Sequence, residues 1–464
     1  MKIWRWILVP LMAALSLGAT TTTAAAAEDV VATEVSFEGS GGVVLHGTVV
    51  APAGQGERRA AMVMVQGAGN RGRQVIRPDA DAFARLGIVV LIYDKRTEGY
   101  SLLHRDYSVL ADDALAGLRL LSARPDVDPR RLGLWAASEG AFVAPLAARR
   151  SDAVRFVIAV GAAGVEPALQ TRWQWSEYLR HGGVSGSLAY TMRETAFRTV
   201  VAAGLFTESD FDAAGAWTGV HQPVLAEWGE LDHDVMPAVS APLIRRALAR
   251  GGNTGVTIRT VPGVRHSLHL TANGGFDHLD AVPADYGRYE AAWIDGLPNV
   301  PGAGAQEPAD REPEVPVIAP LPWYGTPWLQ LAGFTLLVLG FAAYLVTAAV
   351  RRLRGRRYCP PVRRPARWLA GAGLAATLGA PLYLLFMMAS AANVIGPVAL
   401  GRPLPWLALQ LLAVATVAAA AATATAGWRR RREVPRGERV RLGLLVAAGG
   451  LFLPLAAYWG LLLP

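Results

Sequence analysis

The chain has 464 residues, of which 52% are hydrophobic, and its mean hydropathy of +0.27 is too high for a wholly soluble protein. Its 45 lysines and arginines outnumber its 37 aspartates and glutamates, but 16 of the basic residues follow residue 350. Residues 28–326 hold 27 basic and 35 acidic residues, so they exclude the nucleic-acid partner that a pI near 9.9 would otherwise suggest.

The first 27 residues are predicted to be a signal peptide. Lys2 and Arg5 give this segment a basic start, an apolar run follows over 7–17, and the small residues at 25–27 suit cleavage before Glu28. We therefore expect the domain that follows to lie outside the cytoplasm. An uncleaved N-terminal anchor is the alternative, and it would place that domain on the same side of the membrane.

Residues 28–297 alternate apolar, strand-like runs with helical patterns, which is typical of an α/β fold with helices on both faces of a mostly parallel sheet. A hairpin over 35–52 opens the domain. Later strands are predicted at 60–65, 88–93, 131–136, 156–160, 224–228 and 256–261, and helices at 79–86, 107–122, 139–149, 239–250 and 286–295.

About sixty residues separate the predicted strands that end at Val160 and begin at Val224, which is too many for an ordinary connection in such a sheet. Their pattern is mainly helical, so we expect residues 165–221 to form a helical cap inserted in the domain. Its aromatic side chains either line an apolar substrate pocket or pack the cap against the sheet domain. They are Trp173, Trp175, Tyr178 and Tyr190.

The C-terminal part is predicted to be a membrane domain, joined by a proline-rich linker at 298–326. Arginines crowd the loops after its first and third apolar segments, whereas the loop after the second has only Arg402. By the positive-inside rule the crowded loops are cytoplasmic, so we expect a multi-pass cell-membrane protein whose first domain is extracytoplasmic. The four segments, each long enough to cross about 30 Å of hydrocarbon as a helix, are 327–350, 368–391, 404–427 and 442–463.

The segment from Arg131 to Ala141 leads from an apolar strand through a small-x-Ser-x-Gly turn into a helix. This pattern indicates a nucleophile elbow with Ser138 at its tip. Because the turn is tight, the residues two positions before and after the serine, Ala136 and Gly140, must be small. The helix directs its N-terminal dipole and free amides at charge that develops on a substrate. An ordinary helix-capping serine is the alternative.

A serine hydroxyl is a weak nucleophile at neutral pH, so it needs a histidine base and an orienting carboxylate, in the chain order Ser, Asp, His for such a fold. Two of the later strands lead to Asp232 and His266, which we predict to be the acid and the base. Asp234 and His269 are the alternatives, since loop spacing does not fix the register. A metal site completed by both histidines is a third interpretation, without the helical spacing that usually supports one.

A tetrahedral intermediate also needs amide donors for its oxyanion. One is predicted to be the backbone N–H of Glu139, directly after the nucleophile. The other should come from the glycine-rich turn over 66–70, where we choose the N–H of Ala68. A phosphate-binding loop is the competing interpretation of this turn, but the lysine and the spacing of such a loop are missing.

These segments together resemble bacterial α/β-hydrolases of the serine-aminopeptidase-like and dienelactone-hydrolase-like group, generally esterases. The resemblance covers about residues 33–297 and implies carboxylic ester hydrolysis. The chain has Gln66-Gly67 where the family usually has His-Gly, and Arg96-Thr97 where it has Arg-Gly. The segments that carry the resemblance are Val65 to Gly69, Tyr93 to Arg96 with Gly99 and Ser101, the helix from Asp112, Asp126 with Pro129 to Arg131, Ser138 to Gly140, Gly229 with Asp232, and Pro262-Gly263 with His266.

The sequence therefore predicts a membrane-anchored serine hydrolase that cleaves a carboxylic ester or related acyl bond, with a small-molecule or lipid-like acyl substrate and without a cofactor or metal. Acyl transfer to a cell-envelope acceptor is one alternative. A non-catalytic, membrane-associated binding domain is the other. Transport is disfavoured because no charged residue or histidine lies inside the apolar segments.

Overall fold

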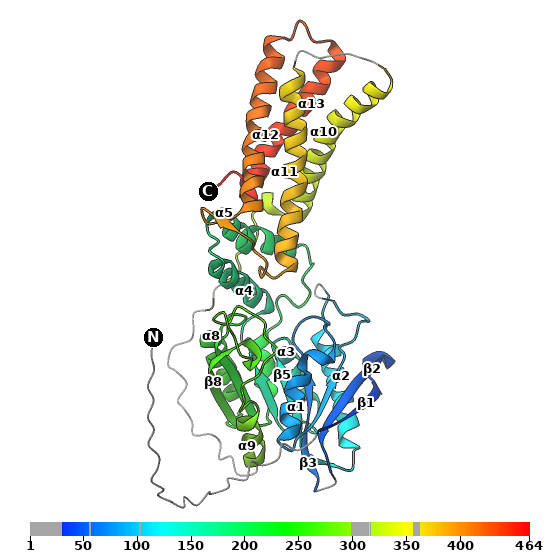
Figure 1. Cartoon of the computed structure of the whole chain (residues 1–464), viewed down its shortest axis with the longest axis vertical. Coiled ribbons are helices and arrows are strands. Elements are labelled where there is room, and N and C mark those ends of the chain that lie inside the picture. The colour runs from blue at the N-terminus through cyan, green and yellow to red at the C-terminus, as the bar shows by residue number, and fades with distance from the viewer. Residues whose placement is uncertain (1–29, 55–56, 102–103, 298–314, 316, 356–361) are drawn as a thin grey trace, which may run out of the picture.

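The computed structural model describes residues 30–54, 57–101, 104–297, 315, 317–355 and 362–464. The predicted signal peptide and most of the predicted linker lie outside these residues. An eight-stranded sheet forms the centre of the first domain, in the order β1-β2-β4-β3-β5-β6-β7-β8 (Figure 1). Its strands are β1 (Val30–Glu38), β2 (Val44–Pro52), β3 (Arg59–Val65), β4 (Val89–Tyr93), β5 (Val127–Ala137), β6 (Val157–Val160), β7 (Val224–Leu231) and β8 (Val256–Arg265).

Strand β2 is antiparallel to both β1 and β4, and the remaining pairs are parallel. Strand β4 is buried along its whole length because helices cover both faces of the sheet, which also explains its unbroken apolar sequence. This arrangement confirms the predicted α/β-hydrolase fold class. Helices α1 (Arg77–Arg85) and α9 (Arg288–Gly296) pack on one face, and α2 (Tyr107–Ser122), α3 (Gly140–Arg150) and α8 (Pro237–Arg250) on the other.

The predicted helical cap follows β6. It contains α4 (Pro167–His181), α5 (Gly186–Tyr190), α6 (Phe197–Ala202) and α7 (Ala213–Ala216). Helix α7 packs beside the sheet, against α3 and α8. Helices α4 and α5 of the cap lie over the edge of the sheet where the parallel strands end, between the sheet and the C-terminal helices (Figure 1). In an α/β sheet this edge is where loops gather functional side chains.

Four helices in the described part of the chain are long and apolar enough to cross a membrane. They form one bundle beyond the cap, and the arginine-bearing ends of α10 and α12 lie at the end of the bundle farthest from the sheet (Figure 1). This confirms the prediction of four long apolar helices in the C-terminal part. They are α10 (Pro327–Leu353), α11 (Arg363–Ala389), α12 (Leu404–Arg429) and α13 (Arg436–Tyr458).

Three helix boundaries in the bundle differ from the prediction by five or six residues. Helices α11 and α13 begin five and six residues early, at Arg363 and Arg436, because each helix continues past its apolar segment into arginine-rich sequence. Helix α13 also ends at Tyr458 rather than near residue 463. Gly460 has φ 76° and the N–H of Leu461 donates to the carbonyl of Ala456 at 2.8 Å, which is a Schellman ending.

The cap packs against the bundle as well as against the sheet domain. Trp175 lies in one buried apolar cluster with the bundle helices and contacts Phe197 edge to face at 5.4 Å. Trp406 and Gln410 of α12 both donate to the hydroxyl of Ser187 in α5, at 3.2 and 3.0 Å. We expected the cap aromatics to line a pocket or pack on the sheet domain, and contact with the membrane helices was not foreseen.

Candidate active site

Ser138 lies at the tip of a sharp turn between β5 and α3. Its φ of 54° is in the left-handed region, which non-glycine residues rarely adopt and which often marks functional sites. A Cβ atom on Gly140 would lie 2.3 Å from the carbonyl oxygen of Val65, so only glycine fits two positions after the serine. The structure therefore has the strand, tight turn and helix that the sequence predicts around this residue.

His266 and Asp232 meet at the neighbouring strand ends. The Nδ1 atom of His266 lies 2.8 Å from Oδ2 of Asp232. The other carboxylate oxygen, Oδ1, accepts the backbone N–H groups of Asp234 and Val235 at 2.9 and 3.1 Å, which fixes the orientation of the acid. Nε2 of His266 is buried and has no hydrogen-bond partner in the described part of the chain.

The histidine ring lies on the same side of the sheet as the elbow. A Cβ atom on Gly161 would come within 2.4 Å of Cε1 of His266, so the ring rests directly on this glycine. Val160, the residue before it, accepts the backbone N–H of Ser138 at 2.9 Å. The backbone of Ser138 and the ring of His266 therefore contact two consecutive residues, Val160 and Gly161, at the end of β6.

The alternative acid, Asp234, holds the cap. Its Oδ1 accepts hydrogen bonds from Nε2 of Gln174 at 2.6 Å and from the hydroxyl of Tyr178 at 2.9 Å, both from α4. Gln170, one turn earlier on the same helix, donates to the backbone carbonyl of Asp234. Asp232, rather than Asp234, therefore contacts the Nδ1 atom of His266.

The alternative base, His269, belongs to a separate buried group. Its Nε2 lies 3.0 Å from Oδ1 of Asp79, which also accepts the hydroxyl of Tyr286 at 2.6 Å. The Nδ1 atom faces the carbonyl of Leu279 at 3.2 Å. His266 and His269 have different partners, and within the described ranges no three metal-ligating side chains group together.

Two carboxylates act on the protonation of His266. Burial acts to lower the pKa of this imidazole, but the charges of Asp232 and Asp234 outweigh it and raise the pKa to about 9, against a small opposing effect of Arg265. Burial acts to raise the pKa of Asp234, but His266 and the donors Gln174 and Tyr178 lower it overall. Asp234 thus stays charged and adds to the field at the base.

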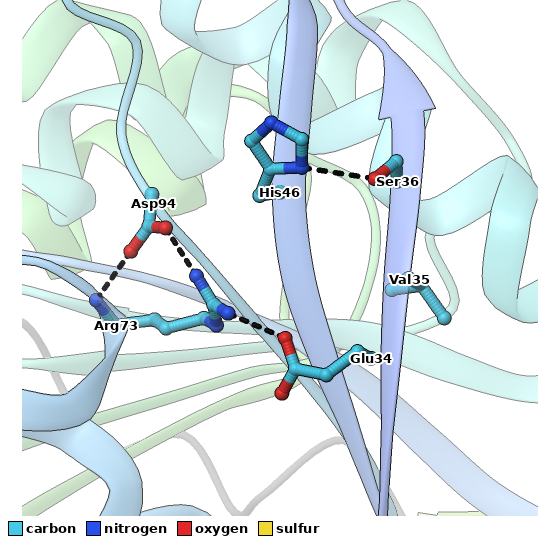
Figure 2. A pocket seen from close by; sticks show the side chains of 6 residues that line it. All are labelled: Glu34, Val35, Ser36, His46, Arg73 and Asp94. Atoms are coloured by element: carbon cyan, nitrogen blue, oxygen red, sulfur yellow. Dashed lines mark hydrogen bonds and ion pairs between the residues drawn. The ribbon is translucent and has the colours of Figure 1, made fainter.

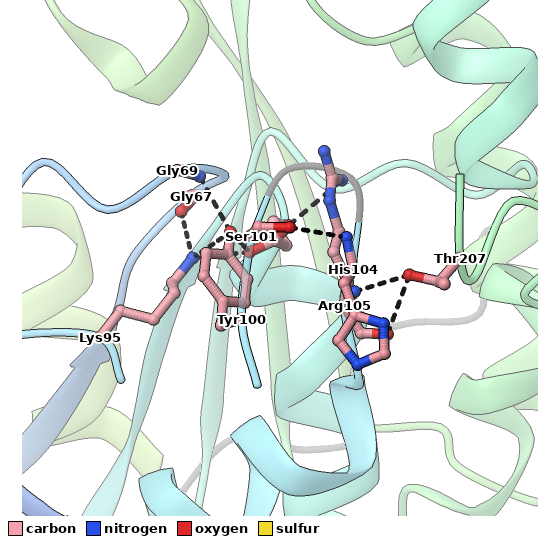
Figure 3. A network of polar contacts seen from close by, with 9 residues as sticks. Gly67, Gly69, Lys95, Tyr100, Ser101, His104, Arg105 and Thr207 are labelled. Carbon is pink, nitrogen blue, oxygen red and sulfur yellow. Dashed lines mark hydrogen bonds and ion pairs between the residues drawn. The ribbon is translucent and has the colours of Figure 1, made fainter. Parts of the chain in front are cut away.

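The turn after β3 lies beside the nucleophile. A Cβ atom on Gly67 would lie 3.2 Å from Cβ of Ser138, and the next residue, Ala68, is exposed. The carbonyl of Gly67 accepts Nζ of Lys95 at 2.6 Å, and the N–H of Gly69 donates to the hydroxyl of Tyr100 at 2.9 Å. Side chains from the loop after β4 thus hold the turn on both sides of Ala68 (Figure 3).

Both of these side chains also reach Glu139, the residue after the nucleophile. Its Oε1 accepts Nζ of Lys95 at 2.6 Å and the hydroxyl of Tyr100 at 2.7 Å, and Arg105 lies 3.2 Å from Oε2. Burial lowers the pKa of Lys95, although Glu139 opposes this. The backbone N–H and C=O of Arg105 contact Thr207 of the cap (Figure 3). Sequence analysis used only the backbone of Glu139 and missed this buried group of charges.

A second Ser–His contact lies outside this site, in a surface groove of about 370 Å³ beside β1 and β2 (Figure 2). The hydroxyl of Ser36 is 2.9 Å from Nδ1 of His46, its cross-strand partner. Arg73 contacts both acidic groups of the groove, Glu34 and Asp94. The serine is in the middle of a regular strand, so this groove lacks the strained turn and amide donors that acyl chemistry needs.

The strand order is that of an α/β-hydrolase fold, and the strained serine after β5 and the buried carboxylate–imidazole pair lie at the ends of its strands. The sequence profile of the prolyl oligopeptidase family, Peptidase S9, matches residues 79–282. That stretch contains Ser138, Asp232 and His266 and ends well before the membrane helices. The matched residues make up less than half of the chain.

Two curated relatives match part of the chain. The polyketide transferase claH of Penicillium crustosum is 33% identical over 133 residues, which is 28% of this chain and 43% of that protein. The thiohydrolase apmlB of Arthrinium phaeospermum is 30% identical over 150 residues, which is 32% of this chain and 48% of that protein. The chain therefore spans less than half the length of each.

Among solved structures, the dienelactone hydrolase of Anabaena variabilis is similar to this chain at 16% identity and a TM-score of 0.37, covering 57% of this chain and 98% of that one. The acylaminoacyl peptidase of Pyrococcus horikoshii is similar at 18% identity and a TM-score of 0.39, covering 53% and 39%.

Proposed function

We propose that this protein is a membrane-bound serine hydrolase that cleaves an ester or related acyl bond through an acyl-enzyme on Ser138. The observation that carries the proposal is the state of His266. Its Nδ1 is engaged by Asp232, its Nε2 is buried and unpartnered, and its ring rests on Gly161, next to the residue that accepts the N–H of the strained Ser138. A base held in this way can take a proton on one nitrogen only.

The proposed reaction has two halves. The hydroxyl of Ser138 attacks the acyl carbon while Nε2 of His266 takes its proton, and Asp232 stabilises the imidazolium. The backbone N–H groups of Ala68 and Glu139 stabilise the oxyanion, and the leaving group departs with the proton from His266. Water then attacks the acyl-enzyme by the same route, with His266 again as base. Every step uses side chains and amides of this chain.

We place the hydrolase domain on the extracytoplasmic side of the membrane. The arginine-rich ends of the bundle lie opposite the hydrolase domain, and such ends are retained in the cytoplasm. A protease added to intact spheroplasts should therefore cut the domain while sparing the arginine-rich loops. If the domain is protected from the protease until the cells are lysed, it lies on the cytoplasmic side and the proposed orientation is wrong.

Acyl transfer is the second candidate, favoured by the similarity to a protein named as a polyketide transferase. In that case the acyl-enzyme would react with a hydroxyl or amine acceptor faster than with water. Adding acceptors to a trapped acyl-enzyme and comparing the rate at which free acid and acylated acceptor appear would separate the two functions. Because the matched profile is that of a peptidase family, the substrates that are tested should also include aminoacyl compounds.

Labelling with a fluorophosphonate tests the nucleophile directly. In the full chain, purified in detergent or nanodiscs, we expect one adduct, on Ser138, because this probe reacts only with serines that an adjacent base activates. Ser138→Ala should abolish the adduct, and Ser36→Ala should leave it unchanged, since Ser36 is the matched serine beside another histidine. Folded protein without an adduct on Ser138 would favour a binding domain. A panel of ester, thioester and peptide substrates would then fix the bond class.

The activity should depend on pH through His266. Because only neutral imidazole accepts the serine proton, we expect kcat/KM to rise with pH and to level off above about pH 9. Asp234→Asn removes one of the two charges that raise the pKa of His266, so the midpoint should move to lower pH. The measurement is kcat/KM for an activated ester from about pH 6 to about pH 10.

The matched control is Glu230→Gln, which removes an exposed carboxylate near the end of β7, four residues before Asp234. Its Oε2 accepts the N–H of Gly263. The midpoint of the Glu230→Gln variant should equal that of the wild type. Equal midpoints for Asp234→Asn and the wild type would show that Asp234 does not act on the base.

A further inference from the structure

A groove of about 360 Å³ lies in the membrane bundle at the end nearest the hydrolase domain. Its walls are the first half of α10 and the second halves of α11 and α13, and it reaches the cap at Thr199 of α6. Most of the side chains that line it are apolar, among them Phe334, Leu337, Ala380 and Leu455. These helices are the ones that cross hydrocarbon, so the groove opens within the membrane.

The groove ends where the helices become close-packed. One turn deeper than Leu337, the buried ring of Phe341 lies so close to Gly373 that a Cβ atom there would be 2.6 Å from it. At the same depth a Cβ atom on Gly340 would be 2.7 Å from Cβ of Ala448. Nearer the hydrolase domain, α11 lines this space with Ala376, Thr377, Ala380, Pro381 and Leu384. The cavity is thus a slot with a closed floor.

Polar groups gather at the mouth of the slot. The amide of Gln330 accepts the indole N–H of Trp459 at 2.8 Å and donates to the carbonyl of Tyr324 at 2.6 Å. Thr199 faces the same end from the cap. Tryptophan and tyrosine typically sit at the level of lipid headgroups, so this end of the groove matches the membrane–water interface. An amphiphile would therefore fit with its chain down and its head towards the cap.

The size of the slot identifies the kind of occupant. From Pro327 to Leu337 the lining of α10 rises about 15 Å at 1.5 Å per residue, so the volume of about 360 Å³ is spread along the helix as a narrow slot. A helix from a partner protein is about 10 Å wide, and a stretch of it about 15 Å long would fill roughly 1,200 Å³, which is more than the slot offers. The slot has room for one hydrocarbon chain, and hydrocarbon chains are the molecules that surround it in a bilayer.

We propose that this groove is a binding site for one acyl chain of a membrane lipid from the leaflet nearest the hydrolase domain, with the lipid head under the cap. The exposed side chain of Leu331 forms part of the rim, so the chain can enter sideways from the bilayer. The site goes beyond the proposed hydrolase activity and does not depend on the role of Ser138.

Photo-cross-linking tests the site. The full chain is placed in nanodiscs with a phosphatidylcholine that carries a diazirine in one acyl chain, and the adducts are mapped by mass spectrometry. We expect adducts to concentrate on Phe334, Leu337 and Leu455, at least about tenfold above lipid-facing residues such as Leu339 and Leu411. An even distribution over the bundle surface would overturn the proposal.

A matched pair of variants adds a second measurement. Ala380→Phe fills the slot and should remove most of the groove adducts, whereas Leu382→Phe alters a side chain that is 66% exposed on the same helix and should change little. Groove adducts at the wild-type level in folded Ala380→Phe would overturn the proposal. If that variant does not fold, the wild-type map alone decides. Ser138→Ala should give the wild-type map, which keeps this result separate from the hydrolase test.

Discussion

Replacing Asp232 by asparagine is expected to lower kcat by about four orders of magnitude. An amide at this position can donate to Nδ1 of His266, which leaves the proton on Nε2 and removes the lone pair that must accept the proton of Ser138. The backbone N–H groups of Asp234 and Val235 can still bond to the remaining oxygen, so the loop should keep its shape. Steady-state kinetics with an activated ester, together with a thermal melt, give the result.

Asp234→Asn is the control for this variant, because it makes the same chemical change two residues away. It should keep most of the plateau kcat, since Gln174 and Tyr178 can still donate to its side-chain oxygen. If Asp234→Asn loses more activity than Asp232→Asn, then Asp234 and not Asp232 is the acid that orients His266.

Replacing Lys95 by methionine should destabilise the hydrolase domain strongly. The Lys95 side chain is 6% exposed and that of Glu139 is 2% exposed. The variant therefore leaves the buried carboxylate of Glu139 without the lysine that pairs with it. Breaking a buried ion pair in this way typically costs about 3–5 kcal/mol. The carbonyl of Gly67 also loses its donor, so the turn that carries Ala68 should loosen and kcat should fall. The melting temperature and kcat of the full chain test both effects.

Two comparisons make the Lys95 result specific. Arg130→Met breaks an ion pair with Asp128 in which the arginine side chain is 85% exposed, and it should leave the melting temperature unchanged. Adding Glu139→Gln to Lys95→Met removes the unpaired charge and should restore part of the lost stability. A Lys95→Met protein that melts with the wild type would mean that the Glu139 carboxylate is satisfied by Tyr100 and Arg105 alone.

Much of the fold could be predicted from the sequence because it follows from burial. A strand covered on both faces must be apolar throughout, and β4 and β6 were visible for that reason. The elbow around Ser138 was visible because steric crowding allows only small residues on either side of the serine. The ends of the membrane helices were less predictable. A helix continues for as long as its backbone hydrogen bonds form, even where the residues of its last turns are polar.

The surroundings of the candidate site could not be predicted in the same way. Whether Asp232 or Asp234 faces His266 depends on a local turn in which Asp232 accepts two backbone N–H groups, and sequence spacing does not encode that geometry. The contacts of Lys95 and Tyr100 with Glu139 join residues about 40 positions apart, and no periodicity links them. The roles of Ser138, Asp232 and His266, with the Ala68 and Glu139 amides, stay predictions until the experiments above are done.

The position of the cap decides which form of this protein can be studied. One side of helix α4 holds Asp234 through hydrogen bonds. The other side buries Trp175 and Leu179 in the apolar cluster that the cap shares with the membrane helices. A fragment that stops before Pro327 would bare this apolar side to water, so we expect it to aggregate or to lose the order of the Asp232 loop. Inactivity of such a soluble fragment would therefore say nothing about Ser138, and the C-terminal helices have to be treated as part of the scaffold of the hydrolase domain.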